Sequence, residues 1–277
     1  RRSTVVYALD DDVSPLVWLP YEGPFEVTDS ASVVAQVFGK GLTSPVPTQR
    51  AFNFQGSPVQ NPAPRLWLRS DVGVSTDGRN VTRWADQSGY GKHATAKAPT
   101  APTLADGSLL GAGSSHMRLS RLVPLAGDCT VVFVASFDTA AGDTTPGDAS
   151  LGAVIGDGDD GWIGVTPDGA LNARFSSADR GWSAAGGGDV SRRSIWTLVR
   201  RGSTLSARRD GQLIGRTDNA SRTTMNAGLI MGMREDASRM DGSLSEVIVF
   251  DTALADERLD VLWGYLRDRH KIDRAGE

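Results

Sequence analysis

Short apolar runs separated by turn residues make up most of this 277-residue chain. The runs are rich in Val, Ile, Phe and Trp, and several alternate apolar with polar positions, which is the period of a half-buried strand. We expect strands in STVVYAL, PLVWLPY, ASVVAQVFG, RLWLRS, TVVFVASF, LGAVIGDG, WIGVTP, ALNARFS, IWTLVRR, TLSARRDGQLIGR, GLIMGMR and LSEVIVFD. Asp168-Gly169 and Asp210-Gly211 lie between such runs and predict hairpin turns. The pattern predicts an all-β sandwich or jelly roll.

One segment near the C-terminus has a helical period instead. In residues 255–272, apolar and aromatic side chains recur at spacings of three and four, followed by a histidine on the same face. These positions are Leu259, Leu262, Trp263, Leu266 and His270. We therefore expect an amphipathic helix that packs its apolar stripe against the sandwich.

The segment 41–64 breaks both periods, because it contains five prolines and little alternation. It predicts a division into a small β-rich piece at 1–45, a Pro-rich linker or arm at 46–64, and a large domain at 65–277. A β piece of this size is marginal alone, so we expect it to dock or oligomerise.

Composition narrows the class of protein. The net charge of −4, with 29 Lys and Arg against 33 Asp and Glu, argues against a phosphate-tracking nucleic-acid surface. No apolar run is long enough to span a membrane, and the N-terminus lacks the apolar core of a signal peptide. Cys129 is the single cysteine, so an intrachain disulfide is impossible.

Two stretches of the large domain carry a family resemblance. The first, PRLWLRSDVGVSTDGRNVTRWADQSGYGKHAT at 64–95, has matching residues at Trp67, Asp71, Trp84, Asp86, Ser88, Gly89, Gly91, His93 and Ala94. The second, at 242–272, matches a closing strand and terminal helix through Gly242, Glu246, Val247, Ile248, Val249, Asp251, Leu254, Glu257, Arg258, Tyr265, Leu266 and Ile272. Both stretches resemble bacterial and phage laminin-G-like domains of the concanavalin A-like lectin-glucanase superfamily. The resemblance implies a concanavalin A-like jelly roll over about 65–272; it does not extend to 1–64.

The motif WADQSGYGKHAT at 84–95 can be interpreted in two ways, as an active site or as a turn. Asp86 and Ser88 can bond nearby backbone groups, Trp84 suits the core, and His93 can bond a neighbour. We favour the turn over a ligand site.

Enzymatic signatures are missing from the sequence. It contains no GxSxG, HExxH or CxxC motif. The glucanases of this superfamily carry acids alternating on one strand face, whereas Glu246 and Asp251 are five apart and fall on opposite faces. We expect no catalytic residues and no enzymatic activity.

Two kinds of binding site remain candidates. Asp157, Asp159 and Asp160 share a glycine-rich turn that could hold Ca²⁺, although a solvated hairpin tip is the simpler interpretation. Trp162 follows this turn, and Trp182 lies with Arg180 in a polar, glycine-rich loop. Aromatic faces with neighbouring polar groups suit carbohydrate binding, and loop-anchoring core residues are the alternative.

The favoured hypothesis is a non-enzymatic accessory protein on a virion (phage head or tail) or a cell surface. Residues 1–64 would dock it on other proteins of the assembly, and the jelly roll would decorate that assembly and bind surface glycans. A purely structural decoration, a secreted bacterial carbohydrate-binding module and a glycoside hydrolase are the alternatives. The expected location is a virion or the extracellular surface.

Overall fold

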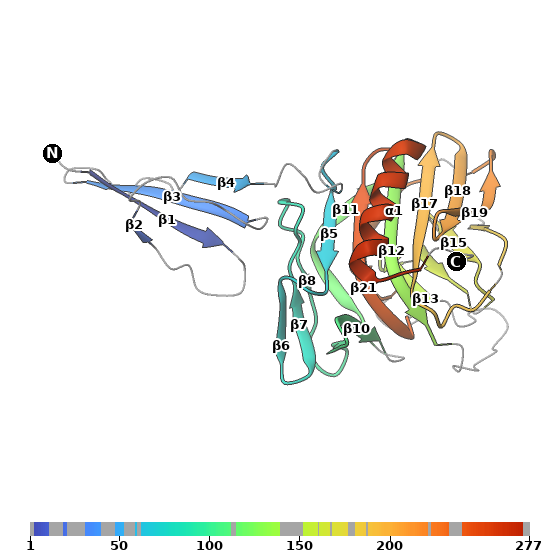
Figure 1. The fold of residues 1–277 in the computed structure, drawn as a ribbon, viewed down its shortest axis with the longest axis horizontal. Coiled ribbons are helices and arrows are strands. Elements are labelled where there is room, and N and C mark those ends of the chain that lie inside the picture. Colours follow the sequence, from blue (N-terminus) through green and yellow to red (C-terminus); the bar gives the residue numbers. More distant parts are fainter. Residues whose placement is uncertain are drawn as a thin grey trace.

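The computed structural model describes residues 3–10, 19–20, 31–39, 48–52, 59 and 62–273, except for 112–114, 139–151, 160, 167, 177–180, 187, 221–222 and 233–239. Its strands fall into two hydrogen-bonded groups, a small N-terminal sheet and a large network near the one helix (Figure 1). The N-terminal strands are β1 (Ser3–Asp10), β2 (Leu19–Pro20), β3 (Ala31–Gly39) and β4 (Thr48–Phe52).

The N-terminal sheet is antiparallel, in the order β2-β1-β3-β4. Strands in the first 45 residues confirm the predicted β-rich piece. The prediction of an arm over 46–64 is wrong at its start, because β4 lies there and pairs with β3. The prolines at 45 and 47 precede this strand and the next is at 58, so every residue of β4 can donate a ladder hydrogen bond.

The large domain consists of strands β5 to β21, which form one network that closes on itself. They are β5 (Leu66–Arg69), β6 (Val74–Asp77), β7 (Asn80–Trp84), β8 (Ala94–Thr95), β9 (Thr103–Ala105), β10 (Ser108–Gly111), β11 (Met117–Leu125), β12 (Cys129–Phe137), β13 (Gly152–Gly156), β14 (Trp162–Val165), β15 (Leu171–Arg174), β16 (Trp182–Ser183), β17 (Ser194–Arg201), β18 (Thr204–Arg209), β19 (Gln212–Thr217), β20 (Met225–Ile230) and β21 (Gly242–Phe250).

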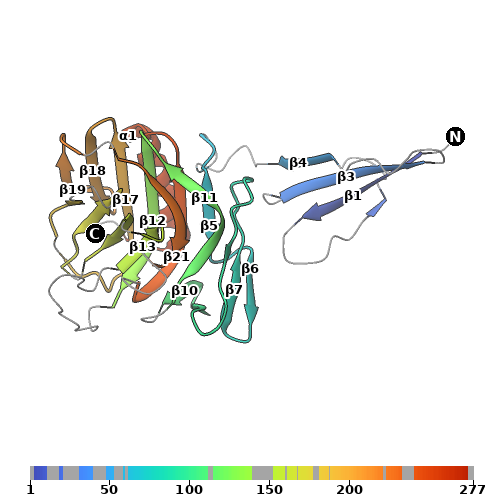
Figure 2. The same cartoon turned by 180° about the vertical axis from the view of Figure 1, so that it is seen from behind.

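Strand pairing divides this network into two antiparallel layers, which Figure 2 shows from behind. The first sheet runs β5-β21-β12-β17-β18-β19. The second runs β6-β7-β8-β11-β20-β13-β14-β15-β16. Strands β9 and β10 bridge the two, because β10 pairs with β21 and β9 pairs with β7. This arrangement confirms the predicted all-β sandwich.

The main core lies between the two sheets. Alternate residues of facing strands point inward and bury Trp84, Phe133, Phe175 and Trp196 together with aliphatic side chains. Burial of side chains this large supplies much of the free energy that opposes the chain's conformational entropy. Residues at the outward positions of each strand form the outer faces of the two sheets.

Helix α1 (Asp256–His270) covers the outer face of the first sheet, as predicted. Leu259, Leu262, Trp263 and Leu266 are buried against outward-facing residues of β12, β17 and β21. The Trp263 Nε1–H donates to Thr197 Oγ1 at 2.9 Å, which satisfies the indole in this second apolar cluster. The sandwich therefore has one outer face covered by the helix.

Both predicted hairpin turns are present. Asp210 and Gly211 have φ of 51° and 90° between β18 and β19, and Gly169 has φ of 82° between β14 and β15. Strand β20 begins three residues before the run GLIMGMR that predicted it. Strands β6 to β11 and β16 were not predicted, since they are short or, in β11, interrupted by exposed residues such as Leu122.

Candidate functional site

The WADQSGYGKHAT motif forms a turn organised by the carboxylate of Asp86. Its Oδ1 accepts the backbone N–H of Trp67 at 3.0 Å and that of Ser88 at 2.9 Å. Its Oδ2 accepts the Ser88 hydroxyl at 2.8 Å and the Lys92 backbone N–H at 2.9 Å. His93 Nδ1 accepts the Asp86 N–H at 3.1 Å. The structural interpretation is confirmed: the acid and the histidine bond neighbouring groups within the turn.

The two candidate sugar-binding tryptophans lie on opposite faces of the second sheet. In the strand ladder Trp182 pairs with Ala173, and Ala173 pairs with Ile163. All three side chains therefore face the core. Trp182 is partly buried against that core. Trp162 is the neighbour of Ile163, so its side chain points outward. The two rings therefore do not line one site, and Trp162 is the one that faces away from the core.

Trp162 belongs to a row of residues that crosses five strands on the outer face of the second sheet. Residues directly opposite each other in a ladder point to the same side. The row comprises Arg118 on β11, Leu229 on β20, Gly156 on β13, Trp162 on β14 and Arg174 on β15. We call these five residues the tryptophan row. It presents a half-buried indole between a guanidinium and a glycine, which has no side chain to cover the ring.

A groove of about 530 Å³ lies over one end of the tryptophan row. Arg118 and Leu229 from the row line it, together with Asp157, Asp159 and Leu122. Leu122 is 56% exposed and lies over Gly228, where a side chain would press against it. The groove thus offers charged groups of both signs beside an apolar wall, next to the predicted acidic loop.

The acidic loop is a hairpin tip held by its own first aspartate. Asp157 Oδ1 accepts the backbone N–H groups of Asp159 at 2.8 Å and Gly161 at 3.0 Å. Among the described residues no three His, Cys, Asp or Glu side chains gather in a way that could hold a metal ion. Asp160, the third predicted calcium ligand, and Arg180, the predicted partner of Trp182, lie outside the described residues.

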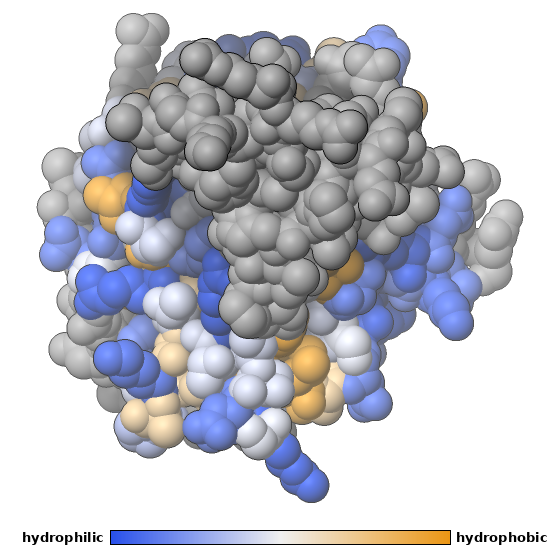
Figure 3. Space-filling model, turned by 90° about the vertical axis from the view of Figure 1, so that its left-hand side faces the viewer, coloured by the Kyte–Doolittle hydropathy of each residue, from blue (hydrophilic) through white to orange (hydrophobic). Residues whose placement is uncertain are grey.

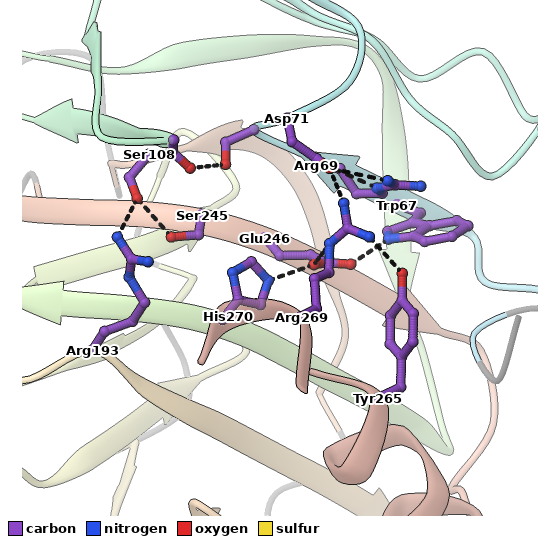
Figure 4. Close-up of polar contacts among 12 residues, drawn as sticks. Trp67, Arg69, Asp71, Ser108, Arg193, Ser245, Glu246, Tyr265, Arg269 and His270 are labelled. Atoms are coloured by element: carbon purple, nitrogen blue, oxygen red, sulfur yellow. Dashed lines mark hydrogen bonds and ion pairs between the residues drawn. The ribbon is translucent and has the colours of Figure 1, made fainter. Parts of the chain in front are cut away.

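A second polar cluster lies on the outer face of the first sheet, at the C-terminal end of α1 (Figure 4). Glu246 on β21, with a side chain 1% exposed, accepts the Trp67 Nε1–H at 2.6 Å. Its other oxygen lies 2.7 Å from His270 Nε2 and 3.4 Å from Arg269 Nε. Arg269 also bonds Asp71 and donates to the Tyr265 hydroxyl at 3.0 Å.

The charges in this cluster compensate one another. Burial acts to lower the pKa of Arg269, but the charges of Glu246 and Asp71 outweigh it and raise that pKa. Burial and the Glu246 charge raise the pKa of Tyr265. Removing one partner of a buried carboxylate leaves an uncompensated charge, which is strongly destabilising. Because Arg269 and His270 are partners of Glu246, the cluster fixes the end of α1 on the sheet. Residues of α1 therefore cover the Glu246 carboxylate, whose side chain is 1% exposed.

Other described surfaces are mostly polar. Among the coloured residues in Figure 3, hydrophilic ones predominate and the hydrophobic ones form small, separate patches. Among the residues whose burial the structure describes, the exposed large hydrophobic ones are Tyr90, Leu104, Leu110, Leu122, Leu213 and Val261. No helix in the described parts of the chain has both the length and the apolar character needed to cross a bilayer.

Comparison with known proteins identifies the fold. The chain matches no protein-family model and no curated protein. The binding domain of botulinum neurotoxin serotype D/C superposes with a TM-score of 0.53 at 12% identity, over 74% of this chain and 53% of that chain. A Trypanosoma rangeli sialidase in complex with sialic acid gives 0.50 at 14% identity, over 88% of this chain and 44% of that chain.

This chain therefore spans about half the length of the solved structures that it resembles. At these identities the similarity shows the fold alone, a jelly-roll β-sandwich. The laminin-G-like resemblance remains a prediction. The tryptophan row could not be predicted from the sequence. Strand pairing brings residues 118, 156, 162, 174 and 229 together, and no local sequence pattern specifies the register of that pairing.

Proposed function

We propose that this protein is a non-enzymatic accessory protein of a virion or cell surface, whose jelly-roll domain binds glycans. The observation that carries the proposal is the tryptophan row, in which Trp162 presents a half-buried ring opposite Arg174, while a polar groove lies over the other end of the row at Arg118 and Leu229. Sugar rings stack their C–H faces on indoles, and guanidinium and carboxylate groups bond the surrounding hydroxyls. Aromatic and charged groups of these kinds lie together here.

The fold comparison supports the same ligand class. One structure with this fold is the binding domain of a neurotoxin, and another is a sialidase that was solved with sialic acid. A shared fold hosts many functions, so the proposal depends on the row itself rather than on these neighbours.

The burial and hydrogen bonding of two carboxylates, Glu246 and Asp86, support the proposal that the protein is not an enzyme. Glu246, the strand acid nearest to a glucanase pattern, lies beneath His270 and Arg269 and is 1% exposed in its side chain. Asp86 is saturated by four hydrogen bonds. General acid catalysis requires a carboxyl within hydrogen-bond reach of the scissile bond, which neither of these two acids offers.

The assembly part rests on the N-terminal sheet. Four strands from the first 52 residues pair only with one another among the described residues. We propose that they dock the protein on partner proteins of the assembly or join copies of the chain. Sedimentation of the full chain over a range of concentrations tests self-association. A monomer that also fails to co-sediment with any surface particle would favour the alternative of a free secreted module.

A glycan array tests the central proposal. We expect the full chain to bind one or more glycans, and Trp162→Ala to lose the binding that depends on the tryptophan row while staying folded. Trp182→Ala is the matched control at a core-facing position, and we expect it to lower stability without removing the surface ring. Running the array with calcium and with a chelator tests the 157–160 loop. Silence of the wild-type chain across a broad array would refute the tryptophan row as a glycan site and favour a structural decoration.

A further inference from the structure

A second row of outward-facing residues crosses the bridge between the two sheets. Ladder partners place Ser136 on β12, Ser243 on β21, Leu110 on β10, Thr103 on β9 and Asn80 on β7 side by side on one face. We call these five residues the hydroxyl row. It shares no residue with the tryptophan row, and four of its five members carry a hydroxyl or an amide.

The hydroxyl row lines a groove of about 660 Å³. Asp138, directly after β12, also lines it, and Pro99, Ala101 and Leu110 contribute apolar groups. Leu110 is 39% exposed, because its neighbour Leu109 faces the core and successive residues of a strand point to opposite sides. The volume lies within the range of small-ligand sites, which combine apolar walls with a few convergent polar groups.

Several polar groups in this groove are available to a ligand. Within the described parts of the chain, no hydrogen bond uses the side chains of Asn80, Thr103 or Asp138, and all three are at least partly exposed. Ser136 and Ser243 bond each other at 2.8 Å, which leaves one hydroxyl hydrogen and further lone pairs unused. An amide, hydroxyls and a carboxylate together can donate to and accept from vicinal hydroxyl groups.

The charge of the groove limits what it can bind. Asp138 is the one charged residue among the described residues that line it, and no Lys or Arg is among them. A carboxylate without a cation repels uronic and sialic acids, whereas it accepts well from neutral hydroxyls. The groups present therefore suit an uncharged, polyhydroxylated ligand.

We infer that the hydroxyl row and Asp138 form a second binding site, for a neutral segment of a polysaccharide. The ligand class follows the proposed function, but the residues and the face are different from those of the tryptophan row. Two separate sites on one domain would let the protein hold a long glycan more tightly than either site alone.

Native gel electrophoresis of the full chain through embedded polysaccharide tests this inference. The probes are galactomannan and xyloglucan, which are neutral, and polygalacturonate, which is acidic. We expect the neutral polysaccharides to retard the wild-type chain more than polygalacturonate does. The double variant Asn80→Ala, Thr103→Val should weaken neutral binding about tenfold or more, because two or three hydrogen bonds are lost. Asp138→Asn should narrow the preference for neutral over acidic probes.

Matched variants separate this site from the first one. Asn226→Ala removes an exposed strand asparagine outside both rows and should bind as the wild type does. Neutral polysaccharides should still retard Trp162→Ala in the gel. Circular dichroism melting shows that each variant is folded.

The inference is overturned if no neutral polysaccharide retards the wild type, or if the double variant migrates as the wild type does. Loss of neutral binding in Trp162→Ala alone would also overturn it, while leaving the proposed function intact. A chain that is silent on the glycan array but is retarded by neutral polysaccharide through Asn80 and Thr103 would support the second site and refute the first.

Discussion

Replacing Asp86 tests whether the most distinctive motif of the sequence is structural. Its carboxylate is 7% exposed and accepts four hydrogen bonds, three of them from the backbone of Trp67, Ser88 and Lys92. Asp86→Ala removes every one of these acceptors. The three backbone donors then lie unpaired at the junction of β5 with the turn that follows β7.

The magnitude follows from the number of orphaned donors. An unsatisfied buried donor costs about 1–3 kcal/mol, and entering water relieves part of this for the turn residues. We therefore expect the free energy of unfolding to fall by about 3–5 kcal/mol. For a domain of this size the melting temperature should drop by on the order of 10 °C. Asp86→Asn keeps one oxygen and should lose roughly half as much.

Urea unfolding followed by tryptophan fluorescence measures this change, with an unchanged m-value as the sign of two-state behaviour. Asp260→Ala is the matched control, since Asp260 is exposed on α1 and has no described partner. It should change the stability by less than about 0.5 kcal/mol. If Asp86→Ala were as stable as this control, the turn would not depend on the carboxylate, and a ligand-binding role for Asp86 would become the better explanation.

Three further predictions concern other parts of the fold. Trp182→Ala should lower the melting temperature measured by circular dichroism more than Trp162→Ala does, because Trp182 packs on the core and Trp162 points outward. Burial acts to raise the pKa of Asp71, but the hydrogen bonds and charges of Arg69 and Arg269 outweigh it and lower that pKa. The stabilisation by Asp71 is thus present above the carboxyl's unfolded pKa and lost as pH falls through the lowered one. Urea titrations at acidic pH should show the wild type losing its advantage over Asp71→Asn below about pH 4, and a constant difference would contradict this. Burial raises the pKa of the Cys129 thiol to about 12, so a thiol reagent at mildly alkaline pH should label the protein only after unfolding. Rapid labelling of the native chain would show that β12 opens.

Local patterns predicted the elements that carry their own signal. The helix at 256–270 repeats apolar residues every three or four positions, and the Asp210-Gly211 turn lies between two clear strands. The role of Asp86 was also readable, because an Asx turn bonds groups two residues away.

The surfaces could not be read in the same way, because they depend on long-range register. Trp162 and Trp182 look alike in sequence, and only their ladder partners show that one faces solvent and the other the core. A shift of one residue in β14 would exchange these faces. The hydroxyl row likewise connects Asn80 to Ser243 through the pairing of β7, β9, β10 and β21. None of these strands carries a sequence motif that indicates a binding site.

The location of a bound glycan tests the central claim most directly. The chain has seven tryptophans, whose indole N–H groups give separate signals in a nitrogen-edited NMR spectrum, and Trp162→Phe assigns one of them. Titration with a glycan found on the array should shift the Trp162 signal in step with saturation and leave the Trp182 signal in place. Saturable binding that leaves the Trp162 signal unmoved would contradict the tryptophan row as the glycan site.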